Sequence, residues 1–81
     1  MQIKVKFLPP VREYIGQESI TLDLPAGATV SQVLAAVRAQ FSAPSDMLNN
    51  LLYMVNYNRA QPDTVLQEGD EVICFKLLGG G

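Results

Sequence analysis

The 81-residue sequence contains no histidine and a single cysteine, Cys74. One cysteine excludes a disulfide framework within the chain, so a reducing compartment, most simply the cytoplasm, is expected. A metal site built from cysteine and histidine is likewise impossible, and no metal is expected. The sequence also lacks a phosphate-binding glycine loop, a catalytic carboxylate pair and a nucleophilic triad. By itself, therefore, the chain has almost no means of catalysis.

Basic residues are few, and long apolar runs are absent. Six lysines and arginines stand against eight acidic residues, giving a net charge of -2. This is not the basic footprint of a nucleic-acid-binding protein. No stretch is long enough to span a membrane, and Met1 leads directly into an alternating segment rather than a signal peptide. With 48% hydrophobic and 17% charged residues, the composition fits one small globular domain.

The first quarter of the sequence predicts two strands separated by a short helix. Residues 3–7 alternate between apolar side chains and lysines, as a half-buried strand does. Pro9-Pro10 ends this strand, because proline cannot donate to the ladder. Val11–Ile15 is then expected to form one or two helical turns that stop at Gly16. Residues 20–24 alternate again and predict the second strand.

The middle of the chain predicts the main helix. Thr29 is a suitable N-cap, and Gln32 occupies the reciprocal position of a capping box. Helical spacing then predicts a buried stripe, whose members are Val30, Val33, Leu34, Val37 and Phe41. Pro44 ends this region, and Ser45 is expected to cap a short turn through Asn49. The stripe must lie on a sheet, with Phe7 among the core residues.

The second half predicts the remaining strands. A third strand is expected from Leu51 to Tyr57, and residues 56–59 are expected to form a turn followed by a short edge element. The last strand is expected from Glu71 to Leu78. It is apolar on both faces except at Lys76, which favours a place in the middle of a sheet. The order of elements predicts an α+β fold of the β-grasp, or ubiquitin-like, plan. Its mixed sheet has four to five strands, with the first and last parallel at the centre and one main helix packed on it.

The sequence ends in Gly79, Gly80 and Gly81, which add nothing to a core and are costly to order. A carboxylate on a stem without side chains can be threaded into a narrow active site of another protein. Reaction with ATP would convert the Gly81 carboxylate into an acyl-adenylate, and a sulfur nucleophile could then displace AMP to leave a thiocarboxylate. The alternative interpretation is a flexible terminus or a linker.

Three other features invite a functional interpretation. Cys74 lies in an apolar strand with no histidine to deprotonate it, so it is expected to be a buried packing residue. Arg12 either contacts a partner or forms a solvated ion pair with Glu13. The adjacent carboxylates of Asp70 and Glu71 follow a glycine and are expected to be turn residues rather than a cation site.

The chain resembles the MoaD/ThiS sulfur-carrier family along essentially its whole length. The matching stretches are residues 7–16 (FLPPVREYIG), 28–30 (ATV), 52–56 (LYMVN), 66–72 (LQEGDEV) and the terminal Gly80-Gly81. The Val-Arg-Glu segment favours the molybdopterin branch, whose members are small subunits of molybdopterin synthase. The Gly-Asp-Glu-Val turn and the diglycine are shared more widely.

The resemblance implies a single β-grasp domain over residues 1–81, with a flexible glycine tail at 79–81. It also implies that an E1-like activating enzyme uses ATP to adenylate Gly81, and that a sulfurtransferase carrying a persulfide supplies the sulfur. The tail would then enter the large synthase subunit, in a heterotetramer, and donate sulfur for the dithiolene of molybdopterin. The chain itself would hold no cofactor.

The stem before the diglycine departs from the family pattern. Relatives commonly carry Phe-Phe-Pro-Pro there. This chain lacks the diproline, and it has a lysine and a third glycine in the same stretch. The residues expected to dock on a partner are Arg12, Phe75, Leu77, Leu78, Gly79 and Gly80. Three alternatives remain open: a carrier for thiamin, cysteine or a specialised tungsten or molybdenum cofactor; a ubiquitin-like protein modifier; and a plain interaction module.

Overall fold

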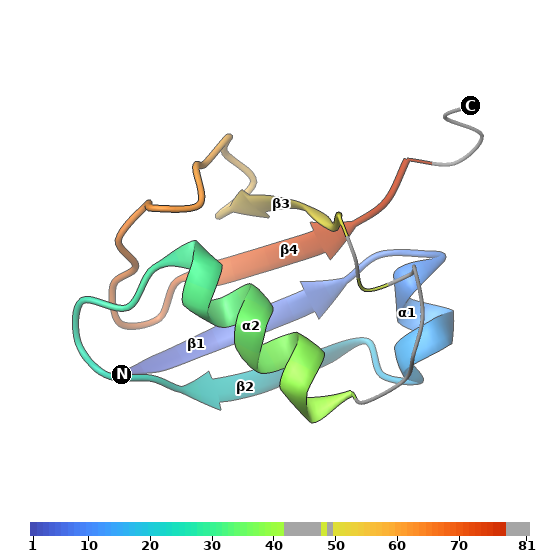
Figure 1. Ribbon diagram of the computed structural model, residues 1–81, viewed down its shortest axis with the longest axis horizontal. Helices are drawn as coiled ribbons and strands as arrows, with labels where there is room; N and C mark the ends of the chain where they lie inside the picture. The colour runs from blue at the N-terminus through green and yellow to red at the C-terminus, as the bar shows by residue number, and fades with distance from the viewer. Residues whose placement is uncertain (42–47, 49, 78–81) are drawn as a thin grey trace.

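Two parallel strands lie side by side at the centre of the sheet. The computed structural model describes residues 1–41, 48 and 50–77, and in it β1 (Gln2–Phe7) pairs with β4 (Glu71–Phe75) from Lys4↔Glu71 to Phe7↔Cys74. The antiparallel strands β2 (Ser19–Asp23) and β3 (Leu52–Val55) flank them. The order is β2-β1-β4-β3, with α2 crossing one face (Figure 1). The predicted α+β, β-grasp arrangement is confirmed, with four strands in the described part of the chain.

Helix α2 (Val30–Gln40) covers one face of the sheet and encloses the core. The predicted capping box is present, and the Thr29 backbone N–H donates to Oε1 of Gln32 at 2.8 Å. The helix buries Val30, Val33 and Val37 against residues of β1 and β4. The buried residues of these two strands in the core cluster are Ile3, Val5, Phe7, Val72 and Cys74.

Helix α1 (Val11–Ile15) closes one end of the sheet, as predicted. It follows Pro9-Pro10, which are joined by a cis peptide bond, and Val11 is its buried residue. Gly16 ends it with φ of 82°, and the Gly16 N–H donates to the Arg12 carbonyl at 2.8 Å. A left-handed backbone at this position favours glycine.

Two residues predicted to lie in the core are less buried than expected. Leu34 and Phe41 are only partly buried. Phe41 lies just past the last helical residue, Gln40, and its side chain is partly buried against the core cluster. Its ring meets that of Phe7 edge to face, with the centroids 6.1 Å apart and the planes at 86°.

Two predicted strands were too long. β3 ends at Val55 rather than Tyr57, because Asn56 and Tyr57 have φ of 50° and 64° and reverse the chain. β4 ends at Phe75 rather than Leu78. The turn predicted after Pro44, from Ser45 to Asn49, lies outside the described residues, as does Leu78.

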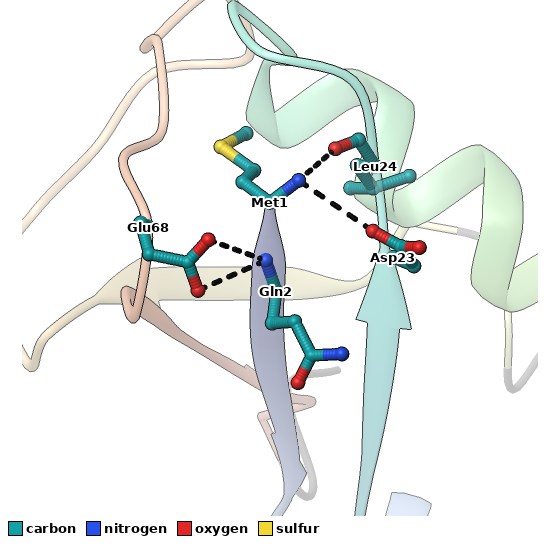
Figure 2. A network of polar contacts seen from close by, with 5 residues as sticks. All are labelled: Met1, Gln2, Asp23, Leu24 and Glu68. Carbon is teal, nitrogen blue, oxygen red and sulfur yellow. Dashed lines mark hydrogen bonds and ion pairs between the residues drawn. The ribbon is translucent and has the colours of Figure 1, made fainter.

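The start of β1 is held from both sides (Figure 2). The amino group of Met1 donates to the Leu24 carbonyl at 2.6 Å and lies 3.5 Å from Oδ1 of Asp23. On the other side, the backbone N–H of Gln2 donates to both carboxylate oxygens of Glu68, each at 3.1 Å. The loops that follow β2 and precede β4 are thereby tied to the same end of the central strand.

Neither described helix has the length and apolar character needed to cross a lipid bilayer.

The two aromatic rings of the core give a direct test of this packing. Phe7→Ala removes a ring with no exposed surface, so it should lower the free energy of unfolding by about 3–5 kcal/mol. Phe41→Ala should cost about 1–3 kcal/mol, since water already reaches part of that ring. Urea unfolding followed by circular dichroism measures both. Equal costs would contradict the marginal position of Phe41.

Candidate functional site

The face of the sheet opposite α2, here called the open face, carries an apolar surface. Because side chains alternate along strands, the register places Ile73 and Phe75 of β4 on this face beside Leu52 and Met54 of β3. Ile73 is fully buried although neither of the two described helices covers this side. Its cross-strand neighbours here are Met54 and Lys6, whose long side chains flank it. Leu52 is 38% exposed, so the surface becomes more accessible toward the end of β4.

A groove of about 420 Å³ runs beside β3 at the edge of the sheet. Its walls come from β3, the end of β4 and the segment after the β3 turn; they are Leu52, Tyr53, Met54, Arg59, Ala60 and Phe75. Arg59 is exposed and supplies the only charge in this lining. Within the described residues, its guanidinium has no ion pair or hydrogen bond. The groove therefore combines apolar walls with one unpaired cation.

An aromatic side chain stands at the rim of the open face. Tyr57 is 57% exposed, and its hydroxyl lies 3.1 Å from Nζ of Lys6, which also sits 5.8 Å from the centre of the ring. This hydrogen bond raises the pKa of Lys6. The Asn56 side chain supports the left-handed turn, because its Oδ1 accepts from the Glu71 N–H and its Nδ2 donates to Asp70, both at 3.0 Å. The turn thus displays Tyr57 while its base is fixed to β4.

The structure brings together part of the predicted docking set. Phe75 is half-buried in the groove, and Leu77 follows it with 72% of its surface exposed. Three other members of this set, Leu78, Gly79 and Gly80, lie outside the described residues, as does the predicted reactive residue Gly81.

Arg12 lies on α1, at the end of the sheet where β1 and β4 both finish. The Leu8 N–H donates to the Cys74 carbonyl at 3.0 Å, which ties the segment before α1 to the end of β4. The Arg12 side chain is 43% exposed and forms a 3.2 Å ion pair with Glu13. The solvated ion pair considered from the sequence is present, and it leaves the guanidinium accessible.

The sequence interpretation of Cys74 as a buried packing residue is confirmed. Cys74 is fully buried, and burial raises its pKa from 9.0 to about 12, so its thiol is poorly suited to act as a nucleophile. Asp70 is a turn residue, as expected, and its carboxylate accepts from the Gln67 N–H at 2.8 Å. Glu71 is the first residue of β4 rather than a turn residue, and it pairs with Lys4 at 3.7 Å. Among the described residues, no three acidic or cysteine side chains gather as a metal site would require.

Sequence reasoning missed several residues of this surface, namely Leu52, Met54, Arg59 and Ile73. The alternation in β3 and β4 was visible, but both faces of these strands are apolar. Only the register with β1 separates the residues under α2 from those on the open face.

Comparison with known proteins places the chain in a family. The model of the ThiS family matches residues 5–81. This chain belongs to the ThiS family. The family comprises sulfur carriers of the MoaD/ThiS type, as the resemblance implied. This ThiS-family chain is 34% identical to a molybdopterin synthase sulfur carrier subunit from Chlamydomonas reinhardtii, and the match covers 100% of both proteins.

Solved structures share the fold of this ThiS-family chain. SAMP1 from Haloferax volcanii, a small archaeal modifier protein, superimposes with a TM-score of 0.84 over 100% of both chains at 21% identity. Subunits 1 and 2 of the molybdopterin-converting factor of Helicobacter pylori form a protein–protein complex. A chain of that structure matches with a TM-score of 0.61 at 20% identity, over 100% of both chains. At these identities the likeness concerns the fold alone.

The low reactivity expected of the buried Cys74 thiol can be tested directly. With its pKa near 12 rather than 9.0, the thiolate fraction at pH 8 should be about a thousandfold lower in the folded protein than in the unfolded chain. Iodoacetamide labelling followed by mass spectrometry should therefore be very slow in buffer and fast in urea. Complete labelling within minutes in buffer would contradict the buried, protonated thiol.

Proposed function

We propose that this ThiS-family chain is the small, sulfur-carrying subunit of a molybdopterin synthase. The observation that carries the proposal is the full-length identity of 34% to the Chlamydomonas reinhardtii sulfur carrier subunit. The complex of the two Helicobacter pylori subunits supports a large synthase subunit as the partner. The buried Cys74 adds a chemical argument, because it leaves the chain's terminal carboxylate as a better place than a thiol to attach sulfur.

The proposed chemistry takes place at the carboxylate of Gly81. An E1-like enzyme joins this carboxylate to the AMP portion of ATP and releases pyrophosphate, which converts a poor electrophile into a mixed anhydride. The terminal sulfur of a persulfide on a sulfurtransferase attacks the carbonyl and displaces AMP. A second thiol then cleaves the resulting acyl disulfide, accepting the other sulfur in a new disulfide and leaving the thiocarboxylate. Glycine suits this position because it places no side chain beside the attacked carbonyl.

The open face is the proposed docking surface. β4 carries Phe75 and Ile73 on this face and is followed by the exposed Leu77, so a protein that receives the tail must approach the same end of the sheet. Arg12 on α1 stands at that end and can contact the same partner. We place the activity in the cytoplasm, where a free thiol such as Cys74 persists.

Two alternatives concern the fate of the activated tail. The fold likeness to an archaeal modifier protein favours a second function, in which the adenylated terminus forms an isopeptide bond with a lysine of a target. A carrier with another sulfur acceptor, such as a thiamin or cysteine precursor or a specialised tungsten or molybdenum cofactor, would retain the thiocarboxylate step. A tagged copy in cells distinguishes the modifier, because only that function yields conjugates of high molecular weight.

The proposal is tested by intact-mass spectrometry of the full chain. After incubation with its cognate activating enzyme, ATP and a persulfide donor, the protein should exchange one oxygen for one sulfur at Gly81. An unchanged mass in the presence of a competent activating enzyme would refute the proposal. Addition of the large subunit and cyclic pyranopterin monophosphate should then restore the original mass as molybdopterin forms; a thiocarboxylate that is stable in this mixture would point to another acceptor.

A chain lacking Gly80 and Gly81 provides the matched control. The truncation lies beyond β4 and the core, so the unfolding transition in urea should be unchanged while sulfur transfer is abolished. A truncated chain that still supports molybdopterin synthesis would leave only the interaction-module interpretation.

A further inference from the structure

The edge of the sheet at β3 exposes backbone hydrogen-bonding groups. The Val55 N–H and C=O both pair with Asn58, at 2.9 and 2.8 Å, so they point away from β4. In an antiparallel ladder the inward and outward residues alternate, and the peptide groups of Tyr53 must therefore point outward as well. The Cys74 carbonyl opposite Tyr53 is consistent with this, because it accepts instead from the N–H of Leu8, the residue that follows β1.

The segment that follows the turn after β3 diverges from β3 before it reaches Tyr53. Asn58 forms a bridge with Val55, but Arg59 and Ala60 form no bridge to β3 and instead make one wall of the groove. In the part of the chain that the structure describes, neither the N–H nor the C=O of Tyr53 has a backbone partner outside the sheet ladder. An unpaired donor and acceptor thus face the groove.

The strand that carries these groups has neither a charged residue nor a proline, two of the features that blunt natural sheet edges. It is short and consists of Leu52, Tyr53, Met54 and Val55. β2, at the other edge, ends in Asp23. An uncharged apolar edge beside a groove is suited to receive another strand.

We infer that the β3 edge is a strand-addition site, where an extended segment of the large synthase subunit pairs with Tyr53 and places a carboxylate on Arg59. Main-chain hydrogen bonds to an exposed edge are a recurrent mode of peptide recognition. The apolar walls select apolar side chains, and the unpaired guanidinium selects an acidic one. This inference rests on the proposed function, because it assigns that partner to a defined edge.

The charges argue against a second copy of this chain as the occupant. β3 itself carries no carboxylate, and pairing two β3 edges would bring Arg59 of each copy to the shared groove without an acidic partner from either strand. A segment of a different protein can supply the missing charge. The groove is also continuous with the surface proposed to contact the partner that receives the tail, because Phe75 lines the groove and lies in β4, two residues before Leu77.

Amide hydrogen exchange of the full chain, measured by NMR, tests the pairing. In the saturated complex with the large subunit, the Tyr53 amide should exchange at least about tenfold more slowly than in the free chain, as expected when an exposed N–H gains a ladder partner. Thr21 is the matched control: it lies in mid-β2, and because Phe7 pairs with Glu18 and Leu24 with Met1, its amide also points outward, at the opposite edge. The Thr21 amide should be unaffected.

Two arginine variants test the charge. Arg59→Gln should weaken binding of the large subunit about tenfold, whereas Arg38→Gln, an exposed residue on α2, should change it less than about twofold because α2 covers the other face. Arg38→Gln should accept sulfur at Gly81 as well as the parent chain does when the persulfide donor is in excess.

The outcomes separate this inference from the proposed function. An intact complex in which Tyr53 exchanges as in the free chain, or in which Tyr53 and Thr21 slow equally, would overturn strand addition and leave the sulfur carrier standing. Strand addition would also be overturned if the Arg59→Gln variant bound the large subunit with unchanged affinity and self-associated in light scattering. Arg59 would then serve only to prevent pairing between copies of this chain. Absence of any complex, despite thiocarboxylate formation, would overturn both the strand addition and the choice of partner. Strand addition is established if exchange of the Tyr53 amide alone slows in the complex and the Arg59→Gln variant binds the large subunit more weakly.

Discussion

The parallel pairing of β1 with β4 is the interaction on which the rest of the structure depends. It sets Val5 and Phe7 beside Val72 and Cys74 on the side covered by α2. By the same register, Ile73 and Phe75 must face the other way. Every property of the open face follows from this one alignment, because a shift of a single residue would exchange the two sides of β4. The proposed docking surface is therefore defined by the same contacts that define the core.

Much of this arrangement could be predicted because the relevant signals are local. Alternation with lysines identified β1, the spacing of valines identified the buried side of α2, and Gly16 marked the end of α1. The prediction that β4 is central followed from its apolar character on both faces. Where sequence reasoning was wrong, competing local geometry prevailed: Asn56 and Tyr57 adopt left-handed backbone that an apolar run does not reveal, and Phe41 falls beyond the last turn of the helix.

The candidate site was less predictable for a physical reason. The glycine tail can be recognised from composition alone, whereas the groove is made by segments that are distant in sequence. Phe75 and Leu52 meet only because β3 and β4 pair, and Arg59 reaches the groove only because the chain reverses after Val55. Neither an apolar strand nor a lone arginine carries a signal for binding until the register and the turn are known. The groove thus arises from tertiary pairing and not from a sequence motif.

The central pairing also has a kinetic consequence. Lys4 and Glu71 are partners although most of the chain separates them, and β4 is the last strand among the described residues. Closing such a distant contact costs chain entropy before it yields any stabilisation, so it is a slow step in folding. A chain that has not completed this step lacks Ile73 and Phe75 on its open face. A partner that docks on that face, as proposed above, would consequently bind folded molecules and not incompletely folded ones.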